Sequence, residues 1–539
     1  MRTYQTLLLG FLFAVSVNLQ AEDTFMYRLY LKDKGVSPFS VENPEQFLSE
    51  KSIERRTKQG YSVDSSDLPY DPAYFGAIEA TGAQIRTYSK WVNTVVVHVP
   101  DLSFLSELAN LSFVDSLHRV WKGSLPSLDA AQGGNAVSLG NASTNLNSHG
   151  NSFMQINMNK GHLLHDLGFY GSGLSIAVID GGFLNVDKID FFDQTQIKEV
   201  KSFNHETSDP LQSSSEHGTR VLSCMLANKT GEMIGTAPLA DYYLFRTEVT
   251  SDEFPVEEDY WIAALEYADS IGVDVVTSSL GYVSFDDSRM SHSYDQLDGK
   301  TIPISKAASM AASKGLLLFN SAGNEGNKSW GKIMFPSDAE SVLTVGSVAD
   351  DRSVSSFSSR GYTADGRVKP DVMAMGSAVT VVDSQGELIS ANGTSFATPI
   401  MAGLATCLWE ALPGLTNVEI IQLIKETASS YLDPTLEMGY GIADVFKAYE
   451  KGKNDTGTSL IASGQYLRVS SQNNCLYVNL DVDFPYSEAF LSVYSGLGVQ
   501  IMSVRNLSGS INVSSLPKGV YVAVLQLDKM KFVSKFVKM

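Results

Sequence analysis

The sequence predicts an α/β protein built on a large, doubly wound parallel sheet, with a small α+β unit before it and an all-β sandwich after it. From residue 153 to 450, near-continuous apolar strands alternate with helical stretches, as in a parallel sheet that helices cover on both faces. Polar segments rich in Ser, Asn and Gly flank this stretch, which is the composition of linkers between structured units.

The chain begins with the pattern of a secretory signal peptide, at residues 1–21. Arg2 gives a positive start, an apolar segment runs from Leu7 to Val17, and Ala21 is a small residue suited to cleavage. This segment is short for a membrane span, which needs about 20 residues. A single membrane anchor is the alternative, but we expect an exported, soluble protein.

Residues 22–122 are predicted to form the small α+β unit. Strands are expected at 26–31, 91–99 and 113–121, and helices at 44–58 and 103–111. The following stretch, 123–152, contains no aromatic residue and is rich in Ser, Asn, Gly and Ala. We expect it to be an exposed linker that is readily cut.

The large domain, 153–450, contains five segments that read as buried strands: 175–180, 240–246, 273–280, 316–323 and 342–348. A second polar linker is expected at 451–463. Residues 464–539 are β-patterned throughout and predict a small antiparallel sandwich.

The charge balance excludes some classes of function. With 60 acidic and 40 basic side chains the net charge is −20, which argues against a nucleic-acid partner because phosphates require a basic surface. Three cysteines rule out a disulfide framework and a multi-cysteine metal site. Cys224 and Cys407 lie in apolar contexts, so we expect buried free thiols.

Three polar residues stand at the ends of predicted elements of the large domain. Asp180 ends a strand, at the sheet edge where open α/β proteins place their sites. His217 opens a helical pattern after a polar loop, and Ser395 lies at the start of another helix. Each also has an ordinary interpretation: a cap, a surface histidine and a helix N-cap, respectively.

The helix at Ser395 and the loop at Asn324 complete the pattern. Gly393 allows a tight backbone before Ser395, and Pro399 is expected in the first helical turn, where amides lack partners. Asn324 stands between glycines after a strand, where its amide could donate to an oxyanion or simply form a turn.

The order Asp180, His217, Asn324, Ser395, each in its own local signature, resembles that of the subtilisin-like serine proteases, the subtilases. The likeness covers roughly 153–450, and the segment 345–376 before the serine is also similar to the family. It implies that Asp180, His217 and Ser395 form a catalytic triad, with Asn324 in the oxyanion hole. Two departures are Gly181, where Thr or Ser is usual, and Arg220, where a second His is common.

The same resemblance implies the substrate-binding residues and the metal content. Residues Ser278, Ser279, Leu280 and Gly281 would pair with an extended substrate, and Ser321, Ala322 and Gly323 would wall the primary specificity pocket. Calcium is common in the family, but the acidic residues within 180–260 do not assemble into a readable set of oxygen ligands. We therefore expect no metal and no other cofactor, with calcium as the alternative that the resemblance leaves open.

The flanking units have resemblances of their own. Residues 22–122 are similar to a subtilase propeptide, which implies a chaperone of folding and an intramolecular inhibitor. The C-terminal unit, 464–539, resembles the type IX secretion sorting domains of Bacteroidetes-type exported proteins, through the segments 493–504, 516–528 and 531–539. The alternative is a sandwich that binds carbohydrate or packs on the protease.

The function implied is that of a secreted, monomeric serine endopeptidase acting on proteins or peptides through an acyl-enzyme. Its sorting domain would engage the secretion machinery, for crossing the outer membrane by a type IX system to the surface or medium. Two rival functions remain open: a non-catalytic binding module on the same fold, and an esterase or lipase. The esterase lacks support because the sequence around Ser395 is NGTSFA and not G-x-S-x-G.

Overall fold

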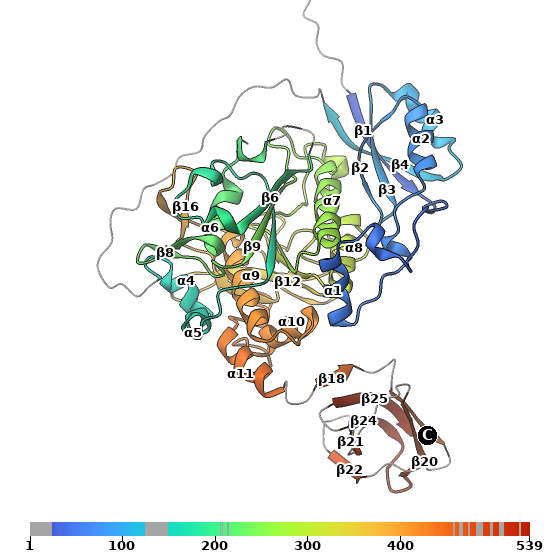
Figure 1. Ribbon diagram of the computed structural model, residues 1–539, viewed down its shortest axis with the longest axis vertical. Helices are drawn as coiled ribbons and strands as arrows, with labels where there is room; N and C mark the ends of the chain where they lie inside the picture. The colour runs from blue at the N-terminus through green and yellow to red at the C-terminus, as the bar shows by residue number, and fades with distance from the viewer. Residues whose placement is uncertain are drawn as a thin grey trace, which may run out of the picture.

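A computed structural model gives the arrangement of the chain (Figure 1). It describes residues 24–123, 149–455 except 205, 207–208 and 213–214, and the segments 459–462, 467–472, 475–480, 489–495, 500–505, 511–527 and 530–538. The predicted signal peptide and most of the predicted linker 123–152 lie outside the described residues.

A seven-stranded, wholly parallel sheet forms the centre of the large domain, in the order β15-β12-β11-β10-β5-β9-β6. Its strands are β5 Ser175–Asp180, β6 Ile197–Ser202, β9 Asp241–Arg246, β10 Val275–Ser278, β11 Leu317–Ser321, β12 Val342–Val348 and β15 Val372–Met375. The five predicted strands are all present. β10 and β11 end earlier than expected, so that residues 279–280 and 322–323 are free to form loops at the sheet edge.

Successive residues of the central strand β5 point to opposite faces, and each face has its own helices. Ile176 and Val178 join a core that includes side chains of α6 (His217–Leu226) and α9 (Thr394–Ala411). Ala177 and Ile179 join the core that α7 (Val256–Ile271) and α8 (Pro303–Ser313) cover. The two helical layers lie on either side of the sheet in Figure 1, which confirms the doubly wound α/β prediction.

The N-terminal unit is a four-stranded antiparallel sheet in the order β2-β3-β1-β4 with short helices. Its elements are β1 Thr24–Leu31, α1 Glu50–Gln59, α2 Pro72–Ala80, β2 Gln84–Ser89, β3 Thr94–Val99, α3 Leu105–Ala109 and β4 Val114–Gly123. The prediction of one helix over 44–58 was wrong. A 3-10 turn at Pro44–Gln46 precedes α1, which starts where the Ser49 side chain accepts from the Ser52 N–H.

A second helix prediction, 103–111, is split in the same way, into a 3-10 turn at Leu102–Phe104 and the short α3. Helix α2 and strand β2 were not predicted from the sequence. β2 reads QIRTYS and is mostly half-buried or exposed, so it carries little of the apolar alternation that predicts a strand.

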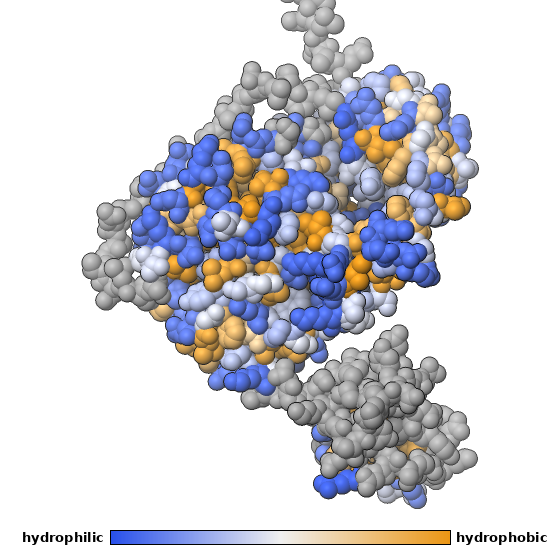
Figure 2. Space-filling view, in the orientation of Figure 1, coloured by the Kyte–Doolittle hydropathy of each residue, from blue (hydrophilic) through white to orange (hydrophobic). Residues whose placement is uncertain are grey.

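The N-terminal sheet uses both of its faces. Val95 and Val97 pack against the unit's own helices. On the other face, Met26 and Trp121 pack against Tyr260 of α7, which ties the unit to the large domain. Figure 1 shows the unit beside α7 and α8, and Figure 2 shows hydrophilic and hydrophobic residues interspersed on the visible face of both parts.

Buried ion pairs reinforce this contact. Arg28 of β1 donates to both carboxylate oxygens of Asp259, at 2.7 and 2.8 Å, and Arg55 and Arg56 of α1 both reach Asp269. All five residues are at most 5% exposed. Such pairs are costly to break, because removing one partner leaves an uncompensated buried charge.

Two further sheets follow the large domain in the chain. One has five strands, in the order β18-β25-β24-β21-β22, and the other has three, in the order β19-β20-β23. The strands are β18 Ser459–Ala462, β19 Leu467–Gln472, β20 Cys475–Leu480, β21 Ala489–Ser495, β22 Gln500–Arg505, β23 Ile511–Asn512, β24 Gly519–Leu527 and β25 Met530–Lys538. The predicted all-β character is confirmed. Within 464–539 the described strand pairings are all antiparallel, as predicted, and β18, which lies in the predicted linker, pairs with β25 in parallel.

The predicted linker 451–463 is also partly regular. Helix α11 (Val445–Asp455) occupies its start, and β18 occupies 459–462. Among the described residues, no helix combines the length and apolar character needed to cross a membrane.

Candidate active site

Asp180 and His217 meet at the carboxyl edge of the central sheet. Asp180 is the last residue of β5 and is fully buried, and His217 is the first residue of α6. The imidazole Nδ1 lies 2.8 Å from Asp180 Oδ1, and the Gly181 N–H donates to the same oxygen at 2.7 Å. The His217 side chain keeps 38% of its surface exposed, so its other nitrogen is accessible from the cleft side.

The second carboxylate oxygen, Asp180 Oδ2, is buried and has no hydrogen-bond partner among the residues that the structure describes. Gly181 stands where the resemblance leads us to expect Thr or Ser, so no side-chain hydroxyl from this position can donate to the carboxylate. The Gly181 backbone supplies one bond to Oδ1, which leaves Oδ2 as the unsatisfied atom. Such buried acceptors are rare and mark strained or functional positions.

The environment of His217 raises its pKa. Burial lowers the pKa, but the negative charge of Asp180 and the hydrogen bond to it raise it by more, while Arg220 opposes them weakly. The imidazolium form is therefore stabilised, which is what a base that must hold a proton during a reaction requires.

Ser395 is the second residue of α9 and is 7% exposed. Gly393, just before the helix, has φ of +154°, a conformation that residues with a Cβ rarely adopt. The Ser395 hydroxyl donates to the backbone carbonyl of Ser279 over 3.4 Å, which is long for an O–H···O bond. The next residue, Phe396, places its ring 6.0 Å from the His217 ring, centroid to centroid.

Pro399 is not in the first turn, as the sequence reading expected. It is the sixth residue of α9, and it therefore deprives the carbonyl of Ser395, four residues earlier, of its helical N–H partner. The Ser279 hydroxyl donates to that carbonyl at 2.8 Å. The Ser279 hydroxyl thus replaces the missing helical N–H, and this hydrogen bond joins Ser395 to the segment after β10.

Asn324 lies in the loop after β11 and is held by its side-chain oxygen. Asn324 Oδ1 accepts from the Thr394 backbone N–H at 3.0 Å and from the Thr394 hydroxyl at 3.1 Å. Because both contacts engage the oxygen, the amide nitrogen is oriented away from Thr394. Asn324 lines the same cleft as His217.

Asp180, His217 and Asn324 border a cleft of about 640 Å³, and Ser395 is joined to its lining through Ser279. Of the predicted substrate-binding residues, the cleft is lined by Ser279, Leu280, Gly281, Ser321 and Gly323. Ser278 and Ala322 are buried behind it. The Ser278 hydroxyl accepts from the Trp261 indole N–H at 2.9 Å, and the Ala322 N–H donates to Val345.

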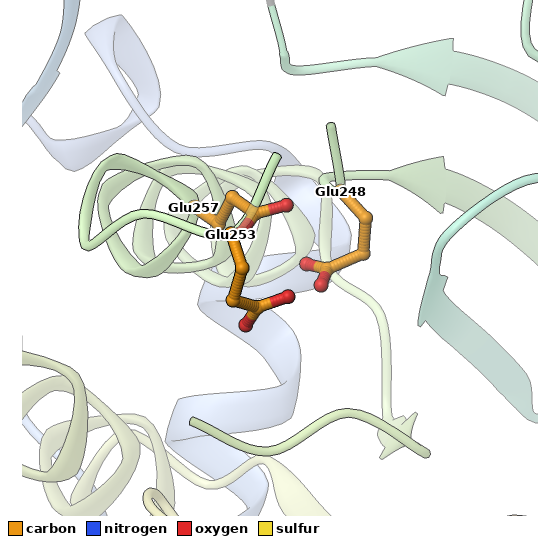
Figure 3. Close-up of side chains that lie close together, drawn as sticks. All are labelled: Glu248, Glu253 and Glu257. Carbon is orange, nitrogen blue, oxygen red and sulfur yellow. The ribbon is translucent and has the colours of Figure 1, made fainter. Parts of the chain in front are cut away.

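One side of the cleft is strongly acidic. Glu248, Glu253 and Glu257 each place a carboxylate oxygen within 4.8 Å of the others, and Figure 3 shows the three groups gathered at the start of α7. Burial raises the pKa of Glu248 to about 8 and, with help from Asp286, that of Glu253 to about 7. Burial and the neighbouring Glu248 raise the pKa of Glu257 well above its ordinary value.

The acidic cluster offers oxygen donors of the kind that a divalent cation binds. Calcium takes six to eight oxygen ligands, so other oxygen donors would have to complete its shell if each carboxylate offers one. Two of the three carboxylates accept from internal donors: the Tyr282 hydroxyl donates to Glu248 at 2.6 Å, and the Val249 N–H donates to Glu257 at 2.7 Å. No step of the chemistry is assigned to a metal.

The sequence reading missed the acidic side of the cleft, although the segment SDEFPVEED after the strand at 241–246 carried the signal. Met334, which lines the cleft beside Gly281 and Gly323, was not predicted either. Met334 gave no signal, because a single methionine in a loop is indistinguishable from a packing residue.

Comparison with known proteins identifies relatives of this chain. The model of the Subtilase family matches residues 171–442, and that of the Peptidase S8 propeptide domain of Bacteroidota matches 26–133. The chain is 30% identical to Subtilisin E of Bacillus subtilis over 288 residues, 53% of this chain and 68% of the relative. It is 29% identical to Subtilisin Savinase of Lederbergia lenta, over 52% of this chain and 92% of that protein.

A solved structure shares the fold: that of the epidermin leader peptide processing serine protease from Staphylococcus aureus, with a TM-score of 0.56 at 16% identity. The match covers 79% of this chain and 98% of that one. The family model and the subtilisin relatives identify a serine peptidase. This chain belongs to the subtilase family, and its N-terminal unit is a propeptide domain.

Proposed function

We propose that the protein is a secreted endopeptidase in which Asp180, His217 and Ser395 act as a catalytic triad. The observation that carries the proposal is the 2.8 Å contact between Asp180 and His217, with the ring next to the residue that follows Ser395. In the structure the Ser395 hydroxyl is held loosely by the Ser279 carbonyl. A rotation about its Cα–Cβ bond would release it to the imidazole, and such contacts often tighten only with substrate bound.

The reaction follows from these positions. Ser395 Oγ attacks the scissile carbonyl while His217 Nε2 takes the hydroxyl proton, and Asp180 holds Nδ1–H and stabilises the imidazolium. His217 then gives the proton to the leaving amine, which departs and leaves an acyl ester on Ser395. Water, deprotonated by His217, hydrolyses the ester and restores the serine.

The oxyanion formed in both steps would accept from the Asn324 amide and the Ser395 backbone N–H. Thr394 fixes the Asn324 oxygen, so that the amide nitrogen is pre-oriented before the charge develops. In subtilisin, loss of one such donor lowers kcat by about 10²–10³. We expect the same loss for Asn324→Ala, with little change in KM.

The substrate would bind in extended form along Ser279–Gly281, with pairing between main chains supplying affinity. The propeptide domain would act as an intramolecular inhibitor, because its strand β4 ends beside the cleft. Trp121 of β4 donates to both oxygens of Asp252, which lines the cleft, at 3.3 Å. Cutting within the predicted linker 123–152 would then release the mature enzyme.

Residues 1–21 and the C-terminal unit support export. The signal-peptide pattern would direct transfer across the inner membrane, and the C-terminal strands would serve as a type IX sorting domain. Deletion of 464–539 should leave peptidase activity in refolded protein but trap the chain in the periplasm of its native host. Normal delivery of the shortened chain to the surface or medium would refute the sorting role.

The proposed chemistry is tested by Ser395→Ala and by the double variant Ser395→Ala/His217→Ala. The first should abolish nearly all peptide turnover, and the second should lose little more, because members of a triad act as a unit. If processing is autocatalytic, Ser395→Ala should also accumulate with its propeptide domain attached. Turnover by Ser395→Ala at the unmodified level would end the serine-peptidase mechanism proposed for this site.

A further inference from the structure

Gly281 and Gly323 form two facing walls of the cleft, and the Met334 side chain lies between them. A Cβ placed on Gly281 would lie 2.8 Å from the Met334 Cβ and 3.4 Å from its sulfur. A Cβ placed on Gly323 would lie 2.7 Å from both Met334 Cγ and the sulfur. The thioether therefore touches both walls and fills the space between them.

The backbone of Met334 is fixed to both walls. Its N–H donates to the Ala322 carbonyl at 3.1 Å, beside Gly323. The next residue, Phe335, exchanges two hydrogen bonds with Tyr282, beside Gly281, at 3.0 and 3.2 Å. The side chain thus starts from a rigid base between the walls, and it is half-buried with its remaining surface in the cleft.

A side chain that enters between these walls meets an apolar floor without a charge of its own. The nearby cation among the cleft-lining residues, Lys328, is paired with Glu325 at 2.8 Å. Small uncharged groups fit above the thioether. An aromatic or long aliphatic group would have to displace it from a slot whose walls are backbone and cannot retreat.

We propose that Met334 sets the primary specificity of the enzyme, by restricting the residue on the acyl side of the scissile bond to small uncharged side chains such as Ala, Ser and Gly. This inference rests on the proposed function and on the assignment of Ser321–Gly323 to the wall of the primary pocket, with Gly281 facing that wall across Met334. The Met334 side chain would make the pocket shallow, a property that could not be predicted from the sequence.

The test uses the matured enzyme and a series of peptidyl-aminomethylcoumarins that differ only in the acyl-side residue: Ala, Ser, Leu, Phe or Lys. Active enzyme is counted by fluorophosphonate titration, so that folding losses do not enter kcat/KM. The unmodified enzyme should prefer Ala to Phe by at least about 10-fold, since even one methylene in a pocket is worth about 10–200-fold.

Opening the slot with Met334→Gly should raise the Phe-to-Ala ratio of kcat/KM by about 100-fold, and Met334→Ala should raise it by a smaller factor. Met334→Leu, of similar volume, is the matched control and should keep the preference for Ala. If Met334→Gly yields no titratable enzyme, Met334→Ala decides the question.

Two results would overturn the inference: a preference for Phe in the unmodified enzyme, or an unchanged Phe-to-Ala ratio in the opened variants. Both leave the proposed function intact. An unmodified enzyme that neither titrates nor cleaves any peptide of the series would instead contradict the proposed function.

Discussion

Ser279, in the segment after β10, and Ser395 of α9 exchange two hydrogen bonds. The Ser279 hydroxyl donates to the Ser395 carbonyl at 2.8 Å, and the Ser395 hydroxyl donates to the Ser279 carbonyl at 3.4 Å. The first bond replaces the one that Pro399 cannot make, and so it anchors the first turn of α9. The second is the weaker, which suits a hydroxyl that must move to the histidine.

Ser279→Ala should destabilise the protein by about 1–3 kcal/mol, because it leaves a buried carbonyl unpaired. Adding Pro399→Ala restores a helical N–H to that carbonyl and should recover much of the loss. Unfolding in urea measures both effects, in a Ser395→Ala background that keeps the carbonyl and prevents autolysis. Equal losses with and without Pro399 would mean that Ser279 stabilises the helix by another route.

Asp180→Asn should move the acid limb of the kcat/KM profile to lower pH. The charge of Asp180 raises the pKa of His217, and its removal lets that pKa fall. Below this pKa the imidazole is protonated and cannot act as a base, so a lower pKa extends activity toward acid. The kcat should fall by about 10⁴, because Asn favours the wrong tautomer. An unmoved acid limb would show that another group controls it.

Glu248→Gln should stabilise the protein at alkaline pH. The native pKa of Glu248, about 8, is above its ordinary value of 4.5, so the native state binds the proton more tightly than the unfolded state. The free energy of unfolding therefore falls as the pH rises from about 4.5 to about 8. Glutamine removes this slope and can still accept from Tyr282.

The measurement is urea unfolding of the Ser395→Ala background at pH 5 and pH 9, with and without Glu248→Gln. Glu387→Gln, at an exposed site, is the control and should leave the pH dependence unchanged. A pH slope that survives Glu248→Gln in full would assign it to other groups of the acidic cluster.

Arg28→Ala should weaken inhibition of the mature enzyme by an added propeptide domain about 100-fold or more. The change strands Asp259 without its buried partner, a loss of about 3–5 kcal/mol. Inhibition constants against a peptide substrate give the effect, and Lys58→Ala, at an exposed site, is the control. Pairing Arg28→Met with Asp259→Leu should restore much of the affinity, because it removes both charges. Similar constants for Arg28→Ala and the unmodified domain would place the binding energy elsewhere.

The sequence predicted most of what depends on local pattern. The buried strands of the central sheet were visible because they are continuously apolar, and the positions of Asp180 and His217 at element ends followed from them. The edge strand β6 was missed, since IKEVKS alternates polar residues and is only half-buried. β15 was missed because it has four residues and follows a proline.

What the sequence could not supply is contact between distant segments. The partnership of Ser279 with Pro399 joins positions 120 apart, and the slot filled by Met334 depends on loops after β10 and β11. The raised pKa of Glu248 arises from burial in a folded cleft. None of these has a local pattern, so each required the structure.

The central claim is that Ser395 is the nucleophile, activated by His217. The most direct test is fluorophosphonate labelling of the matured enzyme, with the labelled residue identified by peptide mass spectrometry. The account predicts one adduct on Ser395, absent in Ser395→Ala and formed far more slowly in His217→Ala. An adduct on another residue, or labelling of Ser395 that is equally fast without His217, would contradict it.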